Sequence, residues 1–114
     1  MKVISNNPLV LEKIEGNYPV TGNPVDVLRK VRRFLESGHD LISMPLPANQ
    51  RLLMNPYKSV IVKDSSEGKD MTGLVLLERA IEKYGSVTFC EDPAADRDLA
   101  LIDLDQVLVA LRMA

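Results

Sequence analysis

The sequence is poor in the residues that many functional sites require. It has no tryptophan, one histidine, one cysteine, three tyrosines and two phenylalanines. So few aromatic side chains disfavour a surface that stacks the bases of single-stranded nucleic acid, and a net charge of −2 argues against a nucleic-acid footprint in general. One cysteine excludes an internal disulfide, and one histidine with one cysteine falls short of a zinc site. We therefore expect no nucleic-acid partner, bound metal or cofactor.

Long apolar stretches are missing as well. No run approaches the roughly 20 residues of a membrane span, and Ser5, Asn6 and Asn7 interrupt the N-terminus where a signal peptide would be apolar. The sequence therefore predicts a cytoplasmic protein without membrane contact. Its 114 residues are 46% hydrophobic, which predicts one small domain over residues 1–114 with a mainly aliphatic core.

Strand and helix patterns alternate along the chain. Short apolar or β-branched runs predict strands at residues 2–5, 18–20, 39–44, 59–62, 87–90 and 99–102. Helix starts are predicted where a capping residue precedes an apolar repeat, at Asn7-Pro8, Asn23-Pro24, Asp70 and Asp103. This alternation predicts an α/β domain with a mostly parallel sheet of four to six short strands and helices on both faces, a Rossmann-like three-layer arrangement.

The ends of the predicted strands are the expected place for a site, because open parallel sheets bind ligands beyond the carboxyl ends of their strands. Three such ends carry polar residues, at 5–7, 43–45 and 63–65. The helix start after Asn7 presents free backbone N–H groups, which favour an anion. The simpler interpretation is that Asn7 only caps its helix.

His39, Tyr57 and Lys58 are the side chains that suggest chemistry. His39 lies at the start of its strand, away from Ser43, so we expect it to hydrogen-bond carbonyls at the end of the preceding helix. General-base catalysis and contact with a partner are the alternatives for His39. Lys58 could lower the pKa of the Tyr57 hydroxyl, and both could bind an anionic ligand. In the structural alternative, Tyr57 folds over the sheet edge and Lys58 stays solvated.

Three other groups have a structural interpretation. The basic cluster at residues 29–33 is interpreted as a solvated helix face, with an anion-binding face as the alternative. Cys90 lies in an apolar run and is expected in the core, with a reactive thiol as the alternative. Four acidic residues are expected to cap helix starts rather than to hold a metal: Asp96, Asp98, Asp103 and Asp105.

The strand-end loops and His39 together supply the predicted binding residues, and no catalytic residue is assigned. These binding residues are Ser5, Asn6, Asn7, His39, Ser43, Pro45, Asn55, Tyr57, Lys58 and Ser59.

Many of these residues belong to a longer pattern. The chain carries, in this order, Lys2-Val-Ile-Ser-Asn-Asn-Pro8, Val27-Leu28-Arg-Lys-Val-Arg, Gly38-His39-Asp-Leu41, Pro45-Leu46 and Asn55-Pro56-Tyr57-Lys58-Ser59-Val60-Ile61. It thereby resembles the GrdX family, mainly over residues 1–62. Members of that family are encoded beside the glycine, sarcosine and betaine reductase genes of amino-acid-fermenting anaerobes.

The resemblance implies a context more than a mechanism. The neighbouring enzymes are selenium-dependent and turn glycine into acetyl phosphate and ammonia with electrons from thioredoxin. We therefore expect a non-catalytic accessory or regulatory protein that binds a reductase component or a small anionic metabolite, and we also consider a homodimer formed through exposed helix or edge-strand surface. The alternatives are a small enzyme acting on an amino acid or acyl phosphate, with Lys58, Tyr57 or His39 as acid or base, and a purely structural subunit.

Overall fold

A computed structural model describes residues 1–65 and 67–113 of the chain. In chain order its elements are β1 (Lys2–Ser5), α1 (Pro8–Lys13), β2 (Asn17–Pro19), α2 (Pro24–Glu36), β3 (His39–Leu41), a 3₁₀ helix (Gln50–Met54), β4 (Ser59–Asp64), α3 (Met71–Tyr84) and α4 (Pro93–Met113). The first four predicted strands and the first three predicted helices are confirmed, although β3 is shorter than expected.

The four strands form one sheet in the order β2-β1-β4-β3. Only β1 and β2 run parallel, whereas β4 is antiparallel to both β1 and β3. The prediction of a mostly parallel sheet is therefore wrong, because a parallel neighbour of β3 would need a crossover connection over one face of the sheet. The chain instead returns from β3 to β4 through a loop that holds only the 3₁₀ helix.

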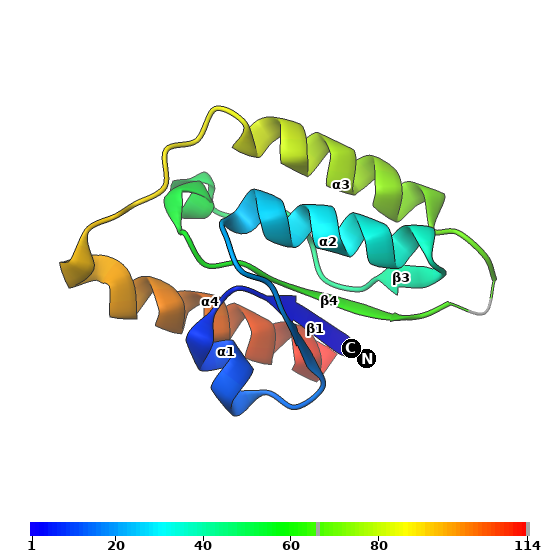
Figure 1. The fold of residues 1–114 in the computed structure, drawn as a ribbon, viewed down its shortest axis with the longest axis horizontal. Coiled ribbons are helices and arrows are strands. Elements are labelled where there is room, and N and C mark those ends of the chain that lie inside the picture. The colour runs from blue at the N-terminus through cyan, green and yellow to red at the C-terminus, as the bar shows by residue number, and fades with distance from the viewer. Residues whose placement is uncertain (66, 114) are drawn as a thin grey trace.

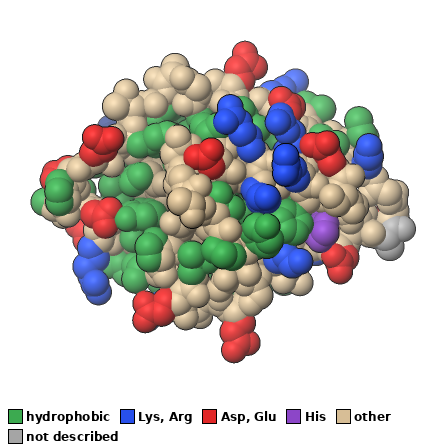
Figure 2. All heavy atoms as spheres, in the orientation of Figure 1, with side chains coloured by type: hydrophobic (Ala, Val, Ile, Leu, Met, Phe, Trp, Pro, Cys, Tyr) green, Lys and Arg blue, Asp and Glu red, His purple; other side chains and the backbone are tan. Residues whose placement is uncertain are grey.

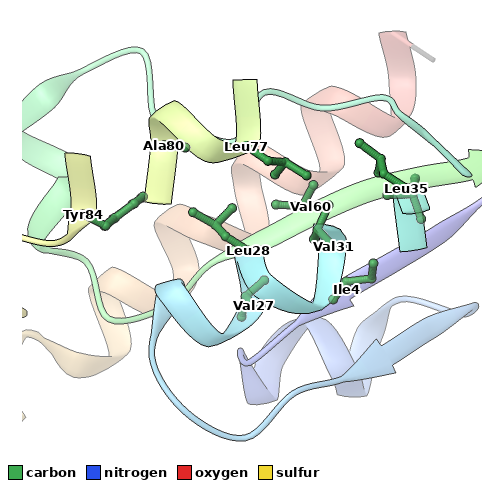
Figure 3. Packing of buried hydrophobic residues seen from close by; sticks show 10 residues of the cluster. Ile4, Val27, Leu28, Val31, Leu35, Val60, Leu77, Ala80 and Tyr84 are labelled. Atoms are coloured by element: carbon green, nitrogen blue, oxygen red, sulfur yellow. The ribbon is translucent and has the colours of Figure 1, made fainter. Parts of the chain in front are cut away.

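Helices cover both faces of this sheet (Figure 1), as the alternation of strands and helices predicted. Adjacent residues of a strand point to opposite faces, so Ile4 packs with the cluster under α2 and α3, whereas Val3 packs with the cluster under α1 and α4. Val60 and Ile61 divide in the same way. Figure 3 shows Ile4 and Val60 facing the apolar side chains of α2 and α3.

The C-terminal third differs from the prediction. Residues 87–90 form no strand, and the apolar run at 99–102 lies inside α4 rather than in a strand. Helix α4 begins at Pro93, where the Asp92 side chain accepts a hydrogen bond from the Ala94 amide at 3.0 Å. The expected start at Asp103 is therefore ten residues too late, and Asp103 lies in the middle of the helix.

The remaining surface groups have simple positions. Figure 2 shows Lys and Arg side chains gathered over α2, and Arg29 and Arg33 are exposed there, as predicted for a solvated helix face. Arg32 forms ion pairs with Glu36 and Glu78. Cys90 is half-buried, so its placement in the core was wrong. Within residues 1–65 and 67–113, no helix is both long and apolar enough to cross a membrane.

Candidate functional site

The direction of β4 decides which predicted strand ends meet. Because β1 and β3 are both antiparallel to β4, their carboxyl ends lie at the edge where β4 begins, and Ser5 pairs directly with Ser59. Residues 63–65 follow the opposite end of β4. The prediction that three polar strand ends lie together at one edge of the sheet is therefore confirmed for the ends of β1 and β3 and wrong for residues 63–65.

His39 lies at that opposite edge, where it pairs with Asp64 in the register of the sheet. Its Nδ1 is 3.1 Å from the Phe34 carbonyl oxygen, near the end of α2, and its Nε2 is 3.0 Å from Asp64 Oδ1. The expected hydrogen bond to the preceding helix is thus confirmed. Five residues of strand, about 17 Å at 3.3–3.4 Å per residue, separate this edge from Ser59, so His39 is no neighbour of the other candidates.

A buried network of polar side chains occupies the first edge. Ser59 Oγ donates to Asp103 Oδ2 at 2.7 Å, and Asn7 Nδ2 donates to the same oxygen at 3.0 Å. The Ser5 and Ser59 hydroxyl oxygens are 2.7 Å apart. Because the Ser59 proton is directed at the carboxylate, the Ser5 hydroxyl donates to Ser59. The Ser5 oxygen in turn accepts from the backbone N–H of Asn7 at 2.9 Å. The four residues thus form one connected and satisfied network between β1, β4 and α4.

Asp103 is the member of this network that the sequence did not reveal. It is 3% exposed, and burial raises the pKa of its carboxyl group, although hydrogen bonds from Asn7 and Ser59 and the charge of Lys58 oppose that rise. The prediction that it caps a helix is wrong. The only sequence signal was an acidic residue among apolar neighbours, and it became informative once α4 was known to start at Pro93.

Lys58 lies beside this network and is 8% exposed, which contradicts the expectation that it stays solvated. Burial lowers the pKa of its amine from 10.5 to about 8, although the nearby charge of Asp103 acts in the opposite direction. Within the described part of the chain, no carboxylate lies within 4.0 Å of its nitrogen, and no side-chain hydrogen bond of its amine occurs there. Lys58 therefore combines a largely buried side chain with the absence of a close carboxylate among the described residues. No fully enclosed side-chain nitrogen there lacks a hydrogen-bond partner, which leaves the Lys58 amine open to the pocket that it lines.

A pocket of about 470 Å³ borders Lys58. Ser43 and Ser59 line it from the sheet edge. Residues 44 and 46–48 supply one wall, and residues 105–107, 109, 110 and 113 of α4 supply the other. Most of the lining residues are apolar, among them Leu46, Ile61 and Val109. Pro45 itself is buried. The pocket thus lies between the start of β4, the segment that follows β3, and α4, with Lys58 in its wall.

Two predicted residues hold the neighbouring loop. Asn6 Nδ2 donates to the Pro56 carbonyl at 2.8 Å, while Asn6 Oδ1 accepts from the Lys58 amide at 2.8 Å. Asn55 Nδ2 donates to the Leu99 carbonyl at 3.0 Å. These bonds fix the backbone that leads to Lys58 against β1 and α4, so Asn6 and Asn55 position Lys58 and do not line the pocket.

The Tyr57 hydroxyl is engaged by Asp96 and is not activated by Lys58. Its hydroxyl donates to Asp96 Oδ1 at 2.6 Å, and this hydrogen bond is the main reason that its pKa is raised to about 12. The hypothesis that Lys58 lowers the pKa of Tyr57 is therefore wrong. Asn7, in contrast, caps α1 as predicted, because its Oδ1 accepts from the Leu9 amide at 3.0 Å. No group of three or more His, Cys, Asp or Glu residues among those described is arranged to hold a metal ion.

The fold and the site define a class of protein, a small three-layer α/β domain with a buried Ser–Asn–Asp network and a lysine in the wall of an apolar pocket. A family model described as GrdX-like protein matches residues 2–112. The chain therefore belongs to the GrdX-like family, and the likeness extends through α4, well beyond residues 1–62. No curated protein and no solved structure matches the chain.

Proposed function

We propose that this protein is a non-catalytic accessory or regulatory protein of the glycine, sarcosine and betaine reductase system, and that it binds a small anionic metabolite at Lys58. Membership of the GrdX-like family supports the association with that system. The observation that carries the ligand class is Lys58, a largely buried lysine that lines a pocket and whose amine has no carboxylate within 4.0 Å among the described residues.

The physical reason is the cost of burying an unpaired charge. A cation removed from water without a close partner destabilises the folded state by several kcal/mol in general. An anion in the pocket would supply the missing partner, and the low dielectric around Lys58 would strengthen the attraction relative to an exposed lysine. The same anion would raise the pKa of Lys58 again, which couples ligand binding to protonation.

A thermal-shift screen of the pure protein tests this proposal. The compounds are acetate, phosphate, acetyl phosphate, glycine, sarcosine and betaine, and the proteins are the wild type, Lys58→Met and Lys63→Met. Lys63 is an exposed lysine of β4 and serves as the matched control. An anion at 100 times its dissociation constant adds roughly 2.7 kcal/mol, a rise of about 10 °C in Tm for a domain of this size.

We expect at least one anion to raise the Tm of the wild type and of Lys63→Met but not of Lys58→Met. A shift that survives in Lys58→Met would place the anion elsewhere. If no anion shifts the wild type, the metabolite part of the proposal fails. Co-purification with purified reductase components then tests the remaining part, a protein partner.

The second candidate is a small enzyme that acts on an amino acid or acyl phosphate. The observation in its favour is the lowered pKa of Lys58, which leaves part of the amine neutral near pH 7–8 and able to act as a base. Tyr57 is engaged by Asp96 and His39 lies at the other edge of the sheet, so Lys58 is the one residue of the three that remains suited to this role. Release of phosphate from acetyl phosphate, abolished by Lys58→Ala and retained by Lys63→Ala, would favour this candidate.

A further inference from the structure

We infer that the pocket beside Lys58 is built for an aliphatic monocarboxylate, an anion with one negative charge and an apolar chain, in preference to a phosphate. The inference rests on the proposed function, because it names the class of anion that the same site takes. Three observations carry it: the chemistry of the walls, the number and sign of the charges, and the size of the pocket.

The walls are mainly apolar, although Ser43, Ser59 and Gln106 also line the pocket. The α4 side contributes Val107, Val109 and Ala110, and the sheet and loop side contribute Ile61 and Leu46. Met44 and Met113 add long flexible side chains that are 65% and 84% exposed. Methionine adapts its shape to apolar ligands, so an alkyl chain would meet aliphatic contacts along both walls.

The charges around the pocket suit one negative charge and no more. Lys58 is the only cationic residue in the described lining, Asp105 lines the pocket as well, and the charge of Asp103 acts on Lys58. Phosphate recognition generally uses arginine forks or several charged donors together. The described lining holds no arginine, and its donors besides Lys58 are the neutral side chains of Ser43, Ser59 and Gln106. A dianion would therefore leave one charge unpaired close to two carboxylates, whereas a carboxylate matches the single ammonium group.

The size of the pocket favours a chain over a two-carbon acid. At about 470 Å³ it lies within the 300–1,000 Å³ typical of sites for small molecules, and acetate would leave most of its aliphatic wall uncovered. Each methylene transferred from water into such a wall improves affinity by about three- to fourfold. We therefore expect the affinity to rise along the series acetate, butyrate, hexanoate and octanoate.

Isothermal titration calorimetry at pH 7 tests this with the chain of residues 1–114. The ligands are the four carboxylates, phosphate, acetyl phosphate, octyl phosphate and the neutral octanamide. The variants are Lys58→Met, Lys63→Met as the matched control, and Val109→Asp, which adds a negative charge at a position that is 44% exposed and lines the pocket. Urea unfolding of each variant verifies that it is folded.

We expect octanoate to bind at least tenfold more tightly than octanamide and octyl phosphate, and at least tenfold more tightly than butyrate. Lys58→Met and Val109→Asp should each weaken octanoate binding at least tenfold, and Lys63→Met should leave it unchanged. The inference is overturned if octanamide binds as well as octanoate, if octyl phosphate binds better, or if affinity does not depend on chain length.

These outcomes distinguish a failure of the monocarboxylate inference from a failure of the proposed anion site at Lys58. Binding of phosphate or acetyl phosphate that depends on Lys58, without any gain from an alkyl chain, would overturn the monocarboxylate and leave the anion site standing. Absence of binding by every anion in the series would remove both.

Discussion

At the scale of single residues, Lys58 and Asp103 are the two charged groups whose pKa values burial shifts against their charged forms. Each is almost fully buried, and for each the burial shifts the pKa toward the neutral form. Asp103 is compensated by hydrogen bonds from Ser59 and Asn7, whereas the Lys58 amine has no such bond within the described residues. A buried group that costs stability and has no structural partner is typical of a functional site.

Lys58→Met should therefore stabilise the protein. The lowering of the Lys58 pKa from 10.5 to about 8 already includes the opposing attraction to Asp103, and it corresponds to a net cost of about 3 kcal/mol at pH 7. Below pH 8 the lysine is protonated in both the folded and the unfolded state, so the cost is complete. Between pH 8 and 10.5 only the folded state releases the proton, so the stability of the wild type rises toward that of the variant.

Urea unfolding of the wild type and of Lys58→Met at pH 7, 8.5 and 10 measures this difference. Lys63→Met, which replaces an exposed lysine of the same strand, should change the unfolding free energy by less than about 0.5 kcal/mol. A variant that is less stable than the wild type at pH 7 would show that Lys58 has a stabilising partner.

At the scale of secondary-structure elements, a capping residue followed by proline begins three of the four helices. Asn7-Pro8, Asn23-Pro24 and Asp92-Pro93 each place a side-chain oxygen before the first turn and a proline where no amide donor is needed. The first two predicted their helices correctly. The third was not recognised as the start of a long helix. The apolar residues that follow it surround the helix instead of marking one face, and four of them stand in a continuous run at 99–102, which was assigned to a strand.

The two asparagine caps should differ in strength although their local motif is the same. Asn23 is exposed and bonds only within the first turn of α2, so Asn23→Ala should cost about 1 kcal/mol. Asn7 is fully buried and also donates to the Ala100 carbonyl at 2.9 Å and to Asp103. Asn7→Ala should cost about 2–4 kcal/mol, because it removes the cap together with two buried hydrogen bonds to α4, one of them to the Asp103 carboxylate.

Thermal and urea unfolding of the two variants compare these costs directly, with each asparagine serving as the control for the other. Equal destabilisation by the two substitutions would mean that the contacts of Asn7 with α4 contribute nothing beyond the cap.

At the scale of the whole molecule, the sheet has two covered faces and therefore two cores. Ile4 belongs to the cluster under α2 and α3, and Ile61 belongs to the cluster under α1 and α4. The exposed side of α4 still carries apolar residues, among them Leu101 at 41% and Val109 at 44% exposure. Scattered apolar residues on a surface are ordinary, so a homodimer remains a prediction.

Substitutions on either face of the sheet should be equally severe. Ile4→Ala and Ile61→Ala each remove a buried side chain of the same volume and should each cost about 2–5 kcal/mol. Leu101→Ala, on the exposed side of α4, should cost less than about 1 kcal/mol. Urea unfolding followed by circular dichroism gives all three values, and a mild effect of Ile61→Ala would mean that α4 does not cover the sheet as described.

By itself, the sequence determined the local features of this protein: the caps of α1, α2 and α3, the buried strand at 59–62, the hydrogen bond of His39 to the end of α2, and the family pattern at 1–62. These depend on contacts between residues close in the chain, which propensity and spacing reveal. Only the tertiary structure decided the direction of β4, the length of α4, and the meeting of Ser5, Asn7, Ser59 and Asp103. The reason is that the contacts of these residues join positions 44 to 96 apart in the chain. The length of α4 was hidden because its apolar residues do not mark one face, and the burial of Lys58 depends on what packs around it.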